Sequence, residues 1–149
     1  MMNPIKEVRE QNKLTMKAFA SLAGIGEQNV VKAEAGMGAS LPPSIVEVIC
    51  RLTGETPTQV MDNYEAWIQQ ELSEVKLPPA SSDFMVANRE QFTEWKNTVC
   101  YLNQVPNTTV GFCKIFKLHP YVIDKWESGK LKSAPLQLVQ RLARMRGIL

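Results

Sequence analysis

The sequence predicts an all-α protein of two small helical domains, each containing a helix-turn-helix. Residues 14–36 have the pattern of a helix, a tight turn and a second helix, and a weaker copy occupies residues 107–129. Outside the copies, apolar residues recur every three or four positions, as they do on the buried face of an α-helix. Prolines and small polar residues break this pattern in segment 76–87. We therefore expect domains at residues 1–75 and 88–149, joined by a linker at 76–87.

The composition is that of a soluble globular protein. Hydrophobic residues make up 44% and charged residues 21% of the 149 residues. No apolar run approaches the ~18 residues of a membrane span, so we expect a cytoplasmic protein without a membrane partner. Cys50, Cys100 and Cys113 show no CxxC pairing and fall at apolar helical positions, which indicates buried thiols. With one histidine and no clustered cysteines, we expect neither a metal ion nor another cofactor.

Charge is distributed unevenly between the two halves. Residues 1–77 carry seven Lys and Arg against ten Asp and Glu, whereas residues 78–149 carry ten against five. The second half is therefore the better equipped, by charge, to bind a phosphate backbone.

Capping and turn residues set the helices of the first domain. Pro4 suits the start of the first helix, and Thr15 is the expected N-cap of the second. Gly24 supplies the turn, because a residue without a Cβ tolerates positive φ. The third helix is expected to stop at Gly36, and a fourth, introduced by two prolines, to stop at Gly54.

A long helix is expected over residues 58–75. Its apolar stripe consists of Val60, Met61, Tyr64, Trp67, Ile68, Leu72 and Val75. A small four-helix domain cannot cover the whole stripe. Either the first half of the helix closes the N-terminal core and the rest packs on the second domain, or two copies of the chain form a homodimer through it.

The second domain is expected to begin with a helix capped by Asn88, which carries Phe92 and Trp95 on one face. The second helix-turn-helix copy follows. A last helix then starts near Pro135, and its arginines are expected to face outward: Arg141, Arg144 and Arg146.

The two copies share three features. Each has a small residue in the middle of its first helix (Ala20, Cys113), an apolar residue just past the turn (Ile25, Leu118), and Glu-x-Gly at the end. This pattern resembles the helix-turn-helix of the lambda repressor and Cro (XRE-type) family. The resemblance implies that the second helix of each copy enters the major groove of DNA while the first braces across the backbone.

The resemblance also implies which residues meet DNA. These are Glu27, Gln28 and Lys32 in the first copy, and Thr109, His119, Tyr121, Asp124, Lys125, Lys130 and Lys132 in the second. Gln28 can read adenine, and Lys32 or Lys125 can read guanine or hold a phosphate. Tyr121 can stack on a sugar or meet a thymine methyl group. Thr109 can donate to a phosphate.

The family's structural pair falls in the first copy only. By resemblance, Arg9 and Glu34 form a buried ion pair that ties the first helix to the recognition helix. The second copy keeps Glu127 but has no arginine at the matching place, and Lys96 is the nearest base. Its connecting loop is also about a residue longer. The first copy thus matches the family's architecture better, and the second matches its DNA contacts better.

These observations predict a sequence-specific regulator of the repressor type, bacterial or phage, that binds double-stranded DNA in the nucleoid. The alternative is an adaptor or phage accessory protein whose acidic N-terminal domain binds a protein partner; a replication or packaging accessory would look the same. The sequence contains no Gly-rich phosphate loop, no metal-ligand spacing and no Ser/His/Asp arrangement, so we do not expect an enzyme.

Overall fold

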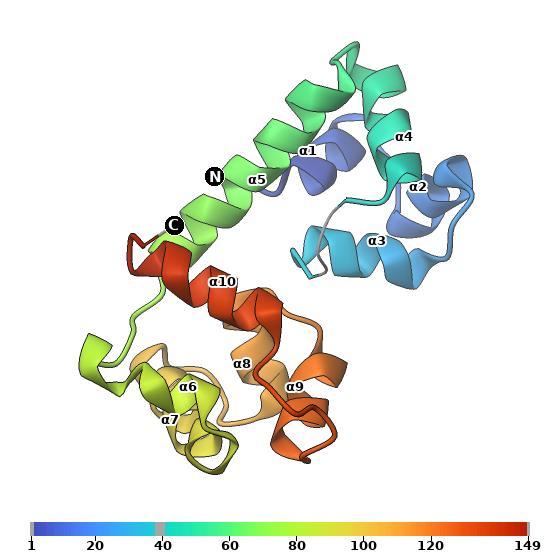
Figure 1. Ribbon diagram of the computed structural model, residues 1–149. Coiled ribbons are helices and arrows are strands. Elements are labelled where there is room, and N and C mark those ends of the chain that lie inside the picture. Colours follow the sequence, from blue (N-terminus) through green and yellow to red (C-terminus); the bar gives the residue numbers. More distant parts are fainter. Residues whose placement is uncertain (1, 38–40, 149) are drawn as a thin grey trace. The chain divides into compact units, whose positions relative to one another are not determined.

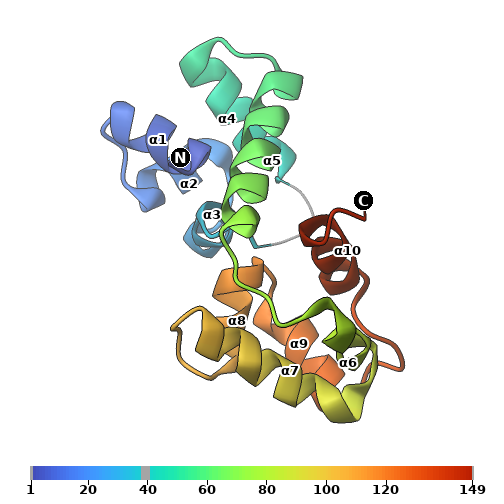
Figure 2. The ribbon, with the colours of Figure 1, turned by 90° about the vertical axis from the view of Figure 1, so that its left-hand side faces the viewer.

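The computed structural model describes residues 2–37 and 41–148, and over these residues the protein is all-α, with no strand (Figures 1 and 2). This confirms the predicted fold class. The chain divides into two compact units, which we call the N-terminal unit (Met1–Glu71) and the C-terminal unit (Leu72–Leu149).

The N-terminal unit is built around a short helical core. Its helices are α1 (Pro4–Gln11), α2 (Met16–Ala23), α3 (Glu27–Glu34), α4 (Pro43–Thr53) and α5 (Pro57–Ser73), the last of which ends just past the division. Asn3 caps α1, since its side chain accepts hydrogen bonds from the backbone N–H groups of Ile5 and Lys6. Phe19, Val30 and Ile45 are fully buried between these helices.

Most of the apolar stripe of α5 is buried. Val60, Tyr64 and Leu72 are among its buried members, together with Trp67 and Ile68. The Tyr64 hydroxyl donates a 2.9 Å hydrogen bond to the carbonyl of Ala33, which fixes α5 on the end of α3. Met61 is 46% exposed. The homodimer predicted through residues 58–75 stays a prediction.

The C-terminal unit has an aromatic core. Its helices are a 3₁₀ turn (Ala80–Ser82), α6 (Phe84–Ala87), α7 (Arg89–Leu102), α8 (Thr109–Phe116), α9 (Pro120–Glu127) and α10 (Leu136–Met145). Phe112 and Phe116 stack with their ring centroids 4.7 Å apart, and Trp95 meets both rings edge-on. Such aromatic pairs stabilise a core beyond the area they bury.

Segment 76–87, predicted to be a linker, is folded into the C-terminal unit. It forms the 3₁₀ turn and α6, and Val86 is buried in the aromatic core. Asp83 accepts two hydrogen bonds from the guanidinium of Arg146, at 2.9 and 2.8 Å. α5 already ends at Ser73, before Pro78 and Pro79, and burial of the apolar side chains after the prolines holds one helical turn.

Of the three arginines that were predicted to face outward, Arg141 and Arg146 instead bind other groups of the fold. Arg141 is only 8% exposed and donates hydrogen bonds to the carbonyls of Phe116 (2.6 Å) and Lys117. These carbonyls lie at the end of α8, where no intrahelical N–H remains to bond them. Arg146 binds Asp83, and only Arg144 is exposed.

Gly111 allows the loop after α7 to lie against α8. A Cβ at this position would stand 2.3 Å from the carbonyl oxygen of Pro106, a backbone atom that cannot turn aside. The loop before the N-cap Thr108 is two residues longer than the one before Thr15 in the N-terminal unit, rather than about one.

Gly111→Ala should therefore destabilise the protein by about 1–3 kcal/mol, the range for an overpacked interior, although alanine is the better helix former. Chemical denaturation followed by circular dichroism measures this. Val110→Ala is the control, because Val110 is adjacent in α8 but 51% exposed. Equal stability of the two variants would contradict the close approach.

The three cysteines should differ in reactivity. Cys100 and Cys113 are buried and Cys50 is partly exposed. Burial, which disfavours the thiolate, raises the pKa of Cys100 and raises that of Cys113 to about 12. At pH 8 we expect one thiol to react rapidly with a thiol reagent, and two to react only after unfolding. Rapid labelling that persists in Cys50→Ser would contradict this assignment.

Candidate nucleic-acid interface

The N-terminal unit contains two short helices joined by a tight turn. Thr15 caps α2 by accepting a hydrogen bond from the N–H of Ala18, as predicted. Gly24 ends α2 in the left-handed region with φ of 68°, where glycine costs least. Gly26 then caps α3. The turn therefore sets the angle between α2 and α3.

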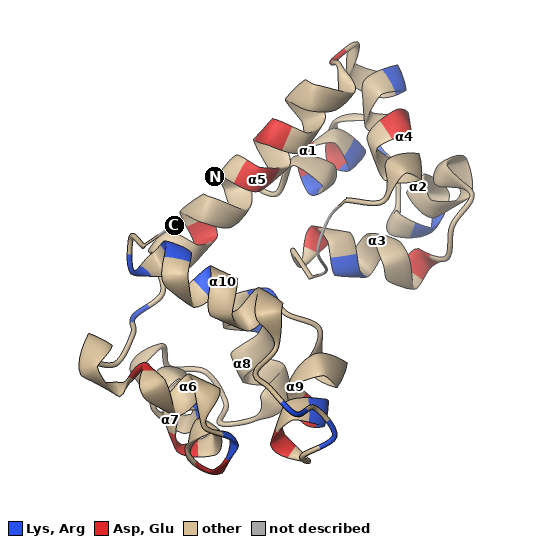
Figure 3. Ribbon diagram, viewed as in Figure 1, with Lys and Arg blue, Asp and Glu red and all other residues tan. Residues whose placement is uncertain are grey.

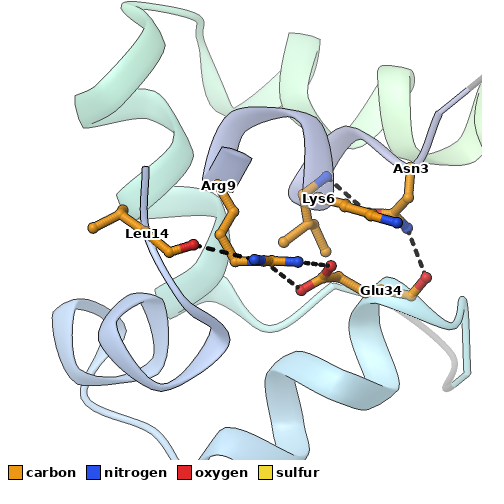
Figure 4. Close-up of polar contacts among 6 residues, drawn as sticks. Asn3, Lys6, Arg9, Leu14 and Glu34 are labelled. Atoms are coloured by element: carbon orange, nitrogen blue, oxygen red, sulfur yellow. Dashed lines mark hydrogen bonds and ion pairs between the residues drawn. The ribbon is translucent and has the colours of Figure 1, made fainter. Parts of the chain in front are cut away.

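One ion pair fixes the far end of α3. The guanidinium of Arg9 donates to both carboxylate oxygens of Glu34, at 3.1 and 3.0 Å, and to the carbonyl of Leu14 (Figure 4). The Glu34 carboxylate raises the pKa of Arg9. Asn3 also donates to the backbone carbonyl of Glu34. This pair ties α1 to the end of α3 and to the loop before α2, as the resemblance implies.

Residues 5–60 match the Helix-turn-helix family model. The match runs from α1 to the start of α5 and covers less than half of the chain. No curated protein and no solved structure matches the chain. The helix-turn-helix domain is therefore shown for the N-terminal unit, and the C-terminal unit lies outside the match.

The described residues reveal neither a helix with the length and hydropathy of a membrane span nor a group of metal-ligating side chains.

The C-terminal unit repeats the landmarks of the helix-turn-helix. The N-cap Thr108, the left-handed residue Lys117 and the terminal Glu127 each stand 93 positions after Thr15, Gly24 and Glu34. Leu118 after the turn is buried. The landmarks therefore recur in the same order and at the same spacing.

The turn of the C-terminal unit is held differently. Lys117 has φ of 58°, which costs a residue with a Cβ about 1 kcal/mol or more. Arg141 binds the carbonyl of Lys117, and Val48 occupies the position 93 residues before Arg141. Arg141 thus stabilises a turn that glycine adopts unaided in the N-terminal unit.

A lysine replaces the arginine of the structural pair. Lys96 Nζ lies 2.8 Å from Glu127, and the Lys96 side chain is 8% exposed. Lys96 stands one helical turn before Cys100, the residue of α7 at the place of Arg9 in α1. The carboxylate also accepts a 2.8 Å hydrogen bond from the Thr93 hydroxyl. α7 is therefore tied to the end of α9 as α1 is to α3.

Thr109 belongs to this internal network, although it was predicted to face a phosphate. Its hydroxyl accepts a hydrogen bond from Lys96 (3.3 Å) and donates one to Glu127 (3.2 Å). The hydroxyl is needed there because a lysine makes fewer bonds to a carboxylate than an arginine fork does. The resemblance places Thr109 beside DNA because of its position at the start of the helix. The Lys96 side chain that binds its hydroxyl comes from α7, which the position in the motif does not reveal.

The exposed face of α3 presents mixed chemistry. Glu27, Gln28 and Lys32 are exposed, and Val31 is 47% exposed beside them. The amide of Gln28 folds back toward Gly26, where a Cβ would meet it at 2.9 Å. The one lysine of this face is accompanied by one glutamate, so α3 offers no net positive charge.

The exposed face of α9 brings its predicted residues together. Tyr121 is 59% exposed, Asp124 is exposed, and Lys125 places its Nζ 4.5 Å from the centroid of the Tyr121 ring. His119 caps the helix, because its Nδ1 accepts a 3.1 Å hydrogen bond from the N–H of Tyr121. Lys130 is exposed in the loop that follows, as is Lys132.

The two units differ in the sign of their net charge. The N-terminal unit carries six Lys and Arg against nine Asp and Glu, and the C-terminal unit carries eleven against six. Figure 3 shows basic residues at the end of α9 and in the loop after it. The corresponding loop 36–42 of the N-terminal unit has no charged residue in its sequence, and residues 38–40 lie outside the described residues.

Lys96→Met should lower the free energy of unfolding by about 2 kcal/mol, less than the ~3–5 kcal/mol of a fully buried pair, because Glu127 keeps the Thr93 hydroxyl. Denaturation of the full chain measures the loss. Lys114→Met, at an exposed position of α8, should change stability by less than ~0.5 kcal/mol. A Lys96 variant as stable as the Lys114 variant would show that the pair does not hold α9.

Proposed function

We propose that the protein is a sequence-specific DNA-binding regulator with two helix-turn-helix domains, and that the C-terminal unit is the main DNA reader. The observation that carries the proposal is the exposed face of α9, where Lys125 and Tyr121 are followed by Lys130 and Lys132. The match of the N-terminal unit to the Helix-turn-helix family supports a DNA-binding role for the chain.

The repeated landmarks support a second helix-turn-helix. A recognition helix must be held at a fixed angle to its bracing helix and must leave its outer face free. In the C-terminal unit the turn at Lys117 sets the angle, and the Lys96–Glu127 pair fixes the far end of α9. The residues that reach out from α9 are polar or aromatic, which suits base edges and phosphates.

The charge of each unit determines which is the better reader. DNA binding draws most of its affinity from lysine and arginine contacts with phosphates, which release counterions. The C-terminal unit has an excess of five positive charges, and the N-terminal unit an excess of three negative charges. We infer that α3 adds little affinity, although Gln28 and Lys32 are exposed where a recognition helix meets bases.

A repressor role of bacterial or phage type, and a cytoplasmic location on the nucleoid, belong to the same proposal and rest on the family resemblance. The proposal involves no catalytic step and no cofactor.

A second candidate function is favoured by the surface of the N-terminal unit. Leu22 and Val31 are about half exposed on α2 and α3, in a unit of net negative charge. Exposed apolar residues among acidic ones suit a protein partner better than DNA. In this reading the C-terminal unit tethers the complex to DNA.

Fluorescence anisotropy of a labelled random-sequence duplex, titrated over a range of salt concentrations, tests the function. The intact chain should bind with a steep salt dependence. The triple variant Lys125→Ala, Lys130→Ala, Lys132→Ala should lower the slope of log affinity against log salt by about 2–3, since each lysine–phosphate contact contributes ~0.9.

A second triple variant, Lys6→Ala, Arg51→Ala, Lys76→Ala, removes the same charge at exposed positions outside α3, α9 and the loop after α9. Its slope should stay closer to that of the intact chain. An equal decrease of the salt slope in the two triple variants would mean that net charge alone attracts DNA. Absence of binding by the intact chain at low salt would reject the regulator and favour the protein partner.

A further inference from the structure

Tyr121 and Lys125 form an assembled pair before any DNA is bound. Lys125 lies four residues after Tyr121, which places both on one face of α9. Its Nζ stands 4.5 Å from the centroid of the Tyr121 ring, within the range of a cation–π contact. The His119 ring meets the Tyr121 ring edge-on, with centroids 6.5 Å apart. The ring is thus held by two neighbours while it stays 59% exposed.

An exposed aromatic ring with restricted motion is suited to recognition. A free surface tyrosine loses side-chain entropy when it is ordered at an interface, and a ring already in place loses less. The pair also positions the lysine, because the cation–π contact favours one arrangement of its long side chain over many. Both groups therefore reach the bases at a set separation.

We propose that Tyr121 and Lys125 determine sequence specificity together, by reading a thymine and a guanine in adjacent base pairs. The inference rests on the proposed function. In the major groove thymine presents its C5 methyl group, which suits an apolar ring, and guanine presents O6 and N7, which accept from an ammonium group.

The separation of the two groups gives the spacing of the bases. The ammonium nitrogen lies 4.5 Å from the ring centroid, and successive base pairs are about 3.4 Å apart along the DNA axis. The two groups therefore reach the same or neighbouring base pairs. Thymine and guanine do not form a base pair with each other in a standard duplex, so they must lie in neighbouring base pairs. Tyr121 and Lys125 therefore read a T–G or G–T step on one strand, or a thymine and a guanine on opposite strands of adjacent base pairs.

The N-terminal unit lacks this combination. Gln28 and Lys32 stand 93 positions before Tyr121 and Lys125, so the lysine recurs and the aromatic ring does not. The thymine preference is accordingly a property of the C-terminal unit.

Selection of binding sites from a randomised duplex library by the full chain should enrich sequences in which thymine and guanine occupy adjacent pairs. In a selected duplex, uracil in place of that thymine removes only the methyl group and should lower affinity about fourfold. In Tyr121→Ala the same replacement should have no effect, whereas Tyr121→Phe should keep the discrimination. 7-Deazaguanine should weaken the intact chain and leave Lys125→Ala unchanged.

Two controls separate specificity from general loss of binding. Lys132→Ala should lower affinity equally for the thymine and uracil duplexes, and uracil at a thymine outside the step should have no effect. Thermal unfolding should show Tyr121→Ala to be folded, since the side chain is exposed.

Enriched sites without adjacent thymine and guanine, or equal binding of the thymine and uracil duplexes by the intact chain, would overturn the inference and leave the DNA-binding function standing. Absence of any binding at low salt would reject the function itself.

Discussion

The positions of α3 and α9 each depend on a carboxylate at the last residue of the helix. Glu34 and Glu127 each lie at the end of an eight-residue helix that is too short to be stable alone. Arg9 of α1 pairs with Glu34, and Lys96 of α7 pairs with Glu127. Each pair leaves the outer face of its helix free. The angle of each of these helices is then set by a turn at one end and an ion pair at the other.

The two units bind the carboxylate at the end of α3 or α9 with different side chains. Arginine reaches both oxygens of Glu34 through its planar fork, so one residue suffices. Lysine offers a single ammonium group, and two threonine hydroxyls complete the bonding of Glu127. The lysine also comes from one helical turn earlier, which places it on the same face of its helix. In both units the ion pair ties an earlier helix to the end of an eight-residue helix, although the basic residue differs.

The features that could be predicted from the sequence are those that depend on residues close together in the chain. The Thr15 cap, the glycine turn and the helical periods were accessible because each depends on neighbours within a few residues. The fold of residues 76–87 and the inward turn of Arg141 depend on groups 24 to 63 positions away, namely the end of α8 for Arg141 and Arg146 for Asp83. The bonds of Thr109 to Lys96 and Glu127 likewise depend on residues of α7 and α9. The exposed residues of α9 were predicted, but their contact with one another required coordinates.

The bond from Arg141 to the turn before α9 has a consequence for synthesis. The turn at Lys117 adopts a conformation that lysine disfavours, and the side chain that stabilises it is encoded 24 codons later. In a growing chain, Arg141 can therefore bind the carbonyl of Lys117 only after the segment up to residue 141 has been synthesised. A chain that stops before residue 141 lacks this bond, so its turn at Lys117 should be less stable than the same turn in the full chain.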